Sequence, residues 1–299
     1  MNLTTNSRYR GCLLGLACGD AVGVAGEFRP RGTFETVTDM IGGGAWHLKP
    51  GEWTDDTSMA LCLAESLLAR GGFDARDQME RYVRWWKMGH LSSNGRCFDI
   101  GNTVMGALTR FLDSRDPFSG STHPRSAGNG SLMRLAPVVM HFAPDRDAAV
   151  HHAGESSRTT HGAAEAMDAC RYYAALLTVA LAGGSKDDIL ATPPPDDLAP
   201  AIAAIASGAY RDKSEPQIES TGYVVHSLEA ALWCFERTES YADAVLAATN
   251  LGYDADTTAA ICGQLAGAHY GAEGIPEAWR ERVAMRDRIE AMADGLIGG

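Results

Sequence analysis

Hydrophobic residues recur at intervals of three and four along most of the chain, and alternating β-branched residues are scarce. This spacing puts apolar side chains on one face of an α-helix. Gly- and Pro-rich stretches interrupt the pattern and indicate where helices end. The pattern predicts helices over residues 9–22, 54–70, 74–88, 101–113, 146–154, 162–182, 198–208, 222–236, 240–250, 255–271 and 276–294.

Three segments lack the helical period and predict loops. Residues 24–53 contain a run of three glycines and predict a long surface loop with, at most, short irregular strands. Residues 114–131 are rich in Ser, Gly and Pro, and residues 191–197 contain three consecutive prolines. Loops of such length often carry function. No composition break, heptad or solenoid period divides the chain, so we expect one all-α domain over residues 1–299.

The first predicted helix carries Gly11, Gly15, Gly19 and Gly23 on one face. In a membrane, this spacing would favour helix dimerisation. The segment is too short to span a bilayer and contains Asp20. We therefore expect close helix packing inside a soluble core.

The overall composition excludes several classes of protein. The chain has 299 residues, 45% of them hydrophobic, and a net charge of −12 without a basic cluster, which argues against binding a nucleic-acid backbone. Its seven cysteines form no Cys-x-x-Cys pair, which favours free thiols in a reducing compartment over a cysteine zinc site. Because neither a secretory leader nor a membrane-spanning run is evident, we expect a cytoplasmic protein.

Two Thr/Asp clusters open predicted helices. Residues 53–59 read Trp-Thr-Asp-Asp-Thr-Ser-Met, and residues 252–258 read Gly-Tyr-Asp-Ala-Asp-Thr-Thr. Helix capping explains one Asp in each cluster but not two. If the two helix starts meet, four carboxylates repel one another unless cations lie between them. Carboxylate and hydroxyl oxygens suit Mg²⁺ or Mn²⁺, so the clusters predict a site for two divalent cations.

Several other residues could contribute chemistry, each with a simpler alternative. Residues 128–134 are Gly-rich and fit either a phosphate-binding backbone loop or a tight turn. Glu27 fits a general acid–base or an exposed loop charge. Asp99 fits a site carboxylate or a helix cap, and His161 fits a ligand contact, a cap or a packing residue. Tyr223 fits a stacking contact with a base or ribose, or core packing.

Taken together, these pieces resemble the ADP-ribosylglycohydrolase family over nearly the whole chain and in the family's motif order. The motifs that carry the resemblance are Gly15-Leu-Ala-Cys-Gly-Asp-Ala-Val-Gly23, Gly51-Glu-Trp-Thr-Asp-Asp-Thr57, Gly128-Asn-Gly-Ser-Leu-Met-Arg134, Thr160-His161, Gly222-Tyr-Val-Val225 and Asp254-Ala-Asp-Thr-Thr-Ala-Ala-Ile261.

The resemblance implies an all-α hydrolase with a binuclear Mg²⁺ or Mn²⁺ centre that releases ADP-ribose from an acceptor. The metal ligands it implies are Thr54, Asp55, Asp56, Asp254, Asp256 and Thr257. The catalytic residues it implies come from Glu27, Asp55, Asp56 and Asp99. The ADP-ribose contacts it implies are Gly128, Asn129, Gly130, Ser131, His161 and Tyr223. We expect a monomer that acts on an ADP-ribosylated acceptor or an ADP-ribose-containing small molecule.

Tyr253 departs from the resemblance, because relatives often have a small or polar residue there; we expect it to reshape the cleft rim without disturbing the metals. Two alternatives stay open. The site could bind ADP-ribose without cleaving it, or it could be a dimetal hydrolase of another nucleotide, such as a pyrophosphatase. The acceptor is not readable from the sequence.

Overall fold

The structure is a computed structural model that describes residues 3–298. Its α-helices are α1 (Thr5–Gly23), α2 (Asp55–Arg70), α3 (Ala75–Met88), α4 (Asn102–Ser114), α5 (Ala136–Phe142), α6 (Arg146–Arg158), α7 (Ala164–Leu181), α8 (Lys186–Leu190), α9 (Pro200–Ala206), α10 (Val224–Arg237), α11 (Tyr241–Asn250), α12 (Ala255–Tyr270), α13 (Glu277–Arg282) and α14 (Arg286–Gly295). Short 3₁₀ helices cover Pro124–Ser126, Glu215–Gln217 and Ala272–Gly274. No strand occurs in residues 3–298, which confirms the all-α prediction.

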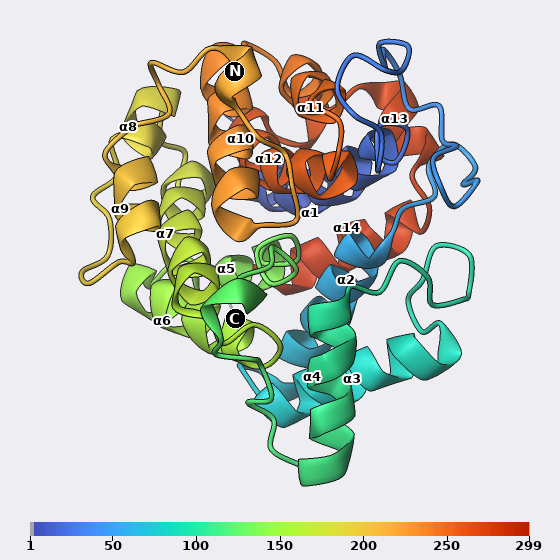
Figure 1. Ribbon diagram of the computed structural model, residues 1–299, viewed down its shortest axis with the longest axis vertical. Coiled ribbons are helices and arrows are strands. Elements are labelled where there is room, and N and C mark those ends of the chain that lie inside the picture. The colour runs from blue at the N-terminus through green and yellow to red at the C-terminus, as the bar shows by residue number, and fades with distance from the viewer. Residues whose placement is uncertain (1–2, 299) are drawn as a thin grey trace.

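Helices α1 and α12 pack against each other, antiparallel, in the interior of the molecule (Figure 1). Small residues let their backbones touch. A β-carbon on Gly11 would lie 2.2 Å from the carbonyl oxygen of Gly267, and one on Gly15 would lie 2.3 Å from that of Gly263. Each four-residue step along α1 is matched by a four-residue step back along α12. The glycine face predicted for close packing therefore serves that purpose.

The antiparallel register brings the C-terminal end of α1 to the N-terminal end of α12. A β-carbon on Gly23 would lie 2.4 Å from the Cα of Asp256, so the backbones remain in contact up to the acidic cluster. The turn that follows α1 carries Glu27. Two acidic segments that are more than two hundred residues apart in the chain thus meet at one point.

Polar side chains attach the Gly-rich segment to this central pair. Gln264 of α12 is fully buried, and its Oε1 accepts a hydrogen bond of 2.8 Å from the backbone N–H of Ala136. Its Nε2 donates to the carbonyl oxygens of Leu132 (3.2 Å) and Met133 (2.8 Å). The Gly-rich segment just before these residues is thereby fixed relative to α12.

The remaining helices surround the central pair, with α6 to α9 to one side and α2 to α4 to the other (Figure 1). The predicted helix over 276–294 is wrong as one element. It breaks between α13 and α14, where Met285 has a left-handed φ of 55°. The pattern also missed the short helices α5 and α8. In the 24–53 loop, the expected strands reduce to one bridge between Gly43 and Leu48. None of the helices in residues 3–298 has the length and apolar character that a membrane span requires.

Candidate metal and ligand site

Six carboxylates converge from four segments of the chain. They are Glu27 after α1, Asp55 and Asp56 in the first turn of α2, Asp99 before α4, and Asp254 and Asp256 at the start of α12. All except Asp56 line one cavity of about 400 Å³. Asp56 lies beneath the cavity and is fully buried. The two Thr/Asp clusters therefore form one site.

Threonine hydroxyls connect the two helix starts. The Oγ1 of Thr54 lies 3.3 Å from Oδ2 of Asp56 and 3.2 Å from Oδ2 of Asp256. From α12, the Oγ1 of Thr257 lies 3.4 Å from the same Asp56 oxygen. Hydroxyl oxygens in these positions can donate to carboxylates or coordinate a cation with a lone pair. Both threonines therefore lie between the two acidic helix starts.

Asp20 of α1 is hydrogen-bonded to the N-terminal end of α2. Its carboxylate accepts hydrogen bonds from the backbone N–H groups of Thr54 (2.9 Å) and Thr57 (3.1 Å) and from both hydroxyls. Thr54 is the N-cap residue of α2, yet its side chain makes no capping bond. Asp20 therefore caps α2 from another helix and fixes the direction in which Asp55 and Asp56 project.

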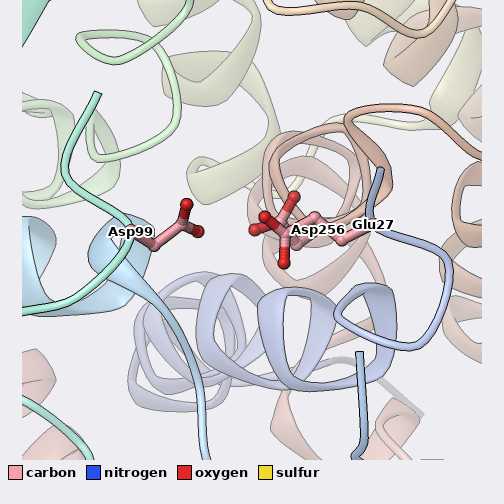
Figure 2. A group of neighbouring side chains, drawn as sticks. All are labelled: Glu27, Asp99 and Asp256. Carbon is pink, nitrogen blue, oxygen red and sulfur yellow. The ribbon is translucent and has the colours of Figure 1, made fainter. Parts of the chain in front are cut away.

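Glu27, Asp99 and Asp256 form the tightest acidic group among residues 3–298. One oxygen of each lies within 4.8 Å of an oxygen of the other two. Figure 2 shows the Asp99 side chain pointing across the site toward Glu27 and Asp256. The N-cap of α4 is Gly101, so the alternative that Asp99 caps this helix is wrong. Glu27 is only 2% exposed, which excludes a solvated loop charge.

Backbone pairing fixes the segment that carries Glu27. The N–H of Phe28 donates to the carbonyl of Tyr253 (2.6 Å), and the N–H of Tyr253 donates to the carbonyl of Arg29 (2.8 Å). Phe28 and Tyr253 both have left-handed φ angles, of 56° and 55°, and large exposed side chains. Tyr253 is 46% exposed and lines a separate hollow rather than the cavity of the carboxylates.

Burial raises the pKa values of these carboxyl groups. Burial first, then the charges of Asp256 and Asp99, raises the pKa of Glu27 to about 12. Burial raises the pKa of Asp99 to about 7. Burial together with neighbouring carboxylates raises the pKa values of Asp55, Asp56 and Asp256 well above their usual range. The raised pKa values mean that no nearby positive group among residues 3–298 stabilises the ionised forms of these carboxyl groups.

Three buried carboxylate oxygens also have no hydrogen-bond partner among the residues described: Oε2 of Glu27, Oδ1 of Asp56 and Oδ1 of Asp256. An unpaired buried carboxylate is costly, and a bound cation removes that cost. The donors are all carboxylate and hydroxyl oxygens, which are the ligands of hard divalent ions. The residues present therefore fit divalent cations.

The Gly-rich segment also lines the cavity. Asn129 donates from Nδ2 to Oδ2 of Asp254 (2.6 Å) and to the hydroxyl of Ser227 (2.8 Å). Gly128, Gly130 and His161 line the same cavity. Ser131 is buried behind it and accepts a hydrogen bond of 2.8 Å from Ser157. The segment forms turns ahead of α5 and lines the cavity.

Tyr223 lies outside the main cavity, in an adjoining hollow of about 680 Å³ that also includes Arg125. The two hollows share Thr103, Gly128 and Gly222. The Tyr223 hydroxyl donates to Oε2 of Glu165 (2.7 Å), so the ring is held in place at the edge of the hollow. Tyr223 is thus separated from the carboxylates but lines a continuation of their cavity.

Asp20 and Trp46 contribute to the site although the sequence alone assigned neither of them a role in it. Asp20 is the only charged residue between positions 11 and 26, and a carboxylate in so apolar a helix was the available signal. Trp46 donates from Nε1 to Oε1 of Glu27 (3.4 Å), and its ring packs 5.7 Å from that of Phe98. Nothing in the local pattern around Trp46 indicated this contact.

The chain is similar to known proteins over nearly its whole length. The profile of the ADP-ribosylglycohydrolase family matches residues 1–299. The chain is 47% identical to an ADP-ribosylarginine hydrolase Tri1 of Pseudomonas putida (strain GB-1), and the match covers 97% of this chain and 78% of that protein. It is 30% identical to the ADP-ribosyl-[dinitrogen reductase] glycohydrolase of Rhodospirillum rubrum, over 98% of this chain and 97% of the relative.

A solved structure described as an ADP-ribosylglycohydrolase-related protein complex superposes with a TM-score of 0.88 at 44% identity, covering 98% of this chain and 97% of that one. The similarity therefore extends over nearly the whole chain. On these grounds, the chain belongs to the ADP-ribosylglycohydrolase family.

Proposed function

We propose that this protein is a metal-dependent hydrolase that removes ADP-ribose from an acceptor. The observation that carries the proposal is the convergence of Asp55, Asp254, Asp256 and Glu27 in one cavity. Asp56 is buried next to them and is in contact with Thr54 and Thr257. A structural protein would not benefit from burying unpaired carboxylate oxygens. The family membership and the names of the relatives support the type of reaction.

Two Mg²⁺ or Mn²⁺ ions are proposed to be held by Thr54, Asp55, Asp56, Asp254, Asp256 and Thr257. Bound there, the cations would supply Lewis-acid polarisation and orientation of ribose hydroxyls. The buried Asp20 would keep the first turn of α2 in place, because its four hydrogen bonds fix both threonines of that turn. Asn129 would orient Asp254 through the 2.6 Å contact.

Glu27 and Asp99 are proposed to act in general acid–base catalysis. An oxygen of each lies within 4.8 Å of an oxygen of the other. Hydrolysis joins the oxygen of water to the anomeric carbon, breaks the bond to the acceptor and passes one proton to the leaving group. A buried carboxyl with a raised pKa can carry such a proton near neutral pH. Asp55 lines the cavity and is a second candidate base.

Arginine is the acceptor we propose, because a relative that is 47% identical is named an ADP-ribosylarginine hydrolase. A guanidinium leaving group is cationic, and the cavity that would release it carries Glu27, Asp55 and Asp99. The guanidinium carries several N–H donors, which these carboxyl oxygens can accept, whereas a hydroxyl leaving group has one donor. We also propose a cytoplasmic location, which is supported by seven free cysteines, six of them buried.

The test is to incubate the purified protein with arginine-linked and serine-linked ADP-ribosyl peptides, with Mg²⁺, with Mn²⁺ and with excess chelator. We expect free ADP-ribose from the arginine-linked peptide, in the presence of metal only. Release of AMP would instead indicate a nucleotide pyrophosphatase. Tight ADP-ribose binding without any product would indicate a binding module. Full activity in chelator, with no metal detected by elemental analysis, would refute the metal site.

A further inference from the structure

Arg134 is a fully buried cation without a carboxylate partner among residues 3–298. Its guanidinium lies over the ring of Tyr82, 4.7 Å from the centroid. Nη1 donates to the carbonyl oxygen of Gly130 (2.9 Å), and Nη2 donates to the hydroxyl of Thr160 (2.7 Å) and, at 3.4 Å, to the carbonyl of Ser156. Its Nε has no hydrogen-bond partner among the residues described. A buried charge surrounded by neutral groups alone polarises those groups strongly.

The Thr160 hydroxyl connects Arg134 to the ring of His161. Its Oγ1 lies 2.9 Å from Nδ1 of His161 and is itself fully buried. An arginine nitrogen can only donate a hydrogen bond, so Oγ1 of Thr160 accepts from Arg134. The hydroxyl hydrogen of Thr160 therefore needs an acceptor of its own. Nδ1 of His161 is the acceptor within reach in the residues described. If Nδ1 carried a proton instead, the buried hydroxyl proton would have no partner, at a considerable cost.

We propose that Arg134 and Thr160 are positioning residues that hold His161 as the neutral tautomer with its proton on Nε2, so that the ring donates one hydrogen bond to an oxygen of the ADP-ribosyl ligand. The role toward the ligand rests on the proposed function; the tautomer does not. Nε2 lies on the cavity side of the ring, because β-carbons on Gly128 and Gly130 would come within 3.4 Å and 3.1 Å of it.

Burial, and then the charge of Arg134, lowers the pKa of His161 to about 3, which keeps the ring neutral across the physiological range. The backbone of His161 is fixed separately. Its N–H donates to the carbonyl of Ser157 (2.7 Å), and its carbonyl accepts from the Ser157 hydroxyl (2.9 Å). Removing the Thr160 hydroxyl therefore changes the proton position on the ring without removing the contacts that place the residue.

The experiment is ¹⁵N NMR of the histidine ring nitrogens in wild-type protein and in Thr160→Val, with His161→Gln used to assign the signal. We expect wild-type His161 to show an unprotonated Nδ1 and a protonated Nε2, without ligand and without metal. In Thr160→Val, this pattern should shift toward a mixture of tautomers. Thr160→Ser keeps the hydroxyl and should restore the wild-type pattern.

Thr159→Val is the matched control. Thr159 is equally buried, and its hydroxyl donates to Ser156 (2.7 Å) and accepts from Gln78 (3.0 Å) without touching His161. Calorimetry with ADP-ribose should show binding weakened about tenfold in Thr160→Val, the scale of one lost hydrogen bond, and close to wild type in Thr160→Ser and Thr159→Val.

A protonated Nδ1 in the wild type overturns the proposal, even if Thr160→Val does not fold. A changed tautomer with unchanged ADP-ribose affinity overturns the ligand contact. Absence of hydrolysis in the wild type would count against the proposed function and leave the tautomer measurement intact.

Discussion

Gly23 lies directly against Asp256: a β-carbon on Gly23 would be 2.4 Å from the Cα of Asp256 and 2.7 Å from the carbonyl oxygen of Ala255. Both of these atoms are backbone and cannot rotate away. The close packing of α1 on α12 therefore extends to a predicted metal ligand, and the geometry of the acidic site depends on a residue without a side chain.

Gly23→Ala should consequently affect stability and metal binding together. Overpacking of this kind costs about 1–3 kcal/mol, and here the displaced backbone carries Asp256. We expect a lower melting temperature and a smaller stabilisation by Mn²⁺, both measurable by thermal unfolding with and without metal. Gly72→Ala is the control, because a β-carbon there meets nothing within 4 Å. If Gly23→Ala behaves like Gly72→Ala, the close packing does not define the site.

Asp20→Asn should weaken metal binding although Asp20 is not proposed as a ligand. Asparagine offers one acceptor oxygen where Asp20 uses two, so N–H and hydroxyl donors at the start of α2 lose partners at about 1–3 kcal/mol. Unfolding and metal titration should both report the loss. Asp145→Asn, at the exposed N-cap of α6, should cost little, because Asn caps as well as Asp. If both variants lose stability and metal affinity equally, Asp20 acts only as an ordinary helix cap.

Asp56→Asn and Asp256→Asn should each abolish most of the stabilisation by Mn²⁺ while leaving the metal-free protein as stable as wild type or more so. Each removes a negative charge from a crowded, buried site. The double variant should be little worse in activity than either single one, because ligands of one site act as a unit.

The control for charge removal at a helix start is Asp74→Asn. Asp74 is a true N-cap that accepts from the N–H of Asp77 (3.0 Å), far from the cavity. Its effect on melting temperature should not depend on Mn²⁺. If Asp56→Asn and Asp256→Asn also lower the melting temperature equally with and without Mn²⁺, then these aspartates are helix caps.

Without metal, stability should fall as pH rises. Burial raises the pKa of Asp20 to about 6 and that of Asp99 to about 7, both above their ordinary value of 3.8. Between about pH 4 and pH 7 the folded protein thus holds protons that the unfolded chain has released, and this contribution to stability is lost as pH rises through that window. Chemical unfolding in chelator from pH 4 to pH 8 measures it. With Mg²⁺ or Mn²⁺ present the loss should shrink, because the cations stabilise the ionised form; an unchanged slope would contradict cation binding here.

Glu27→Gln should slow turnover by about 10²–10⁴-fold, the usual range for a general acid–base group, while metal content and ADP-ribose affinity stay close to wild type. The variant keeps the shape of the side chain and the carbonyl oxygen that can accept from Trp46. Glu35→Gln, in the same loop but exposed, should have wild-type kinetics. If Glu27→Gln also loses metal, Glu27 is a ligand, as its proximity to Asp256 and Asp99 allows.

The sequence predicted the helical architecture because long amphipathic segments reveal their period locally. Ten of the eleven predicted helices have a matching single helix, and the exception is 276–294. That segment keeps an apolar period across Met285, whose left-handed backbone breaks the helix. Helices α5 and α8, of seven and five residues, were not predicted, whereas α9, also of seven residues, was. Segments this short show too little of a helical period for a consistent prediction.

The paired acidic motifs and the glycine face of α1 were also readable from the sequence, since both are local patterns. What only the tertiary structure decided is how distant residues combine. The antiparallel register of α1 and α12 brings Glu27 to Asp256, and a single carboxylate in α1 caps α2. Burial also depends on the tertiary structure. Whether a buried carboxyl group keeps its proton or binds a cation depends on the charges and hydrogen-bond donors around it. Those neighbours come from segments that are far apart in the sequence.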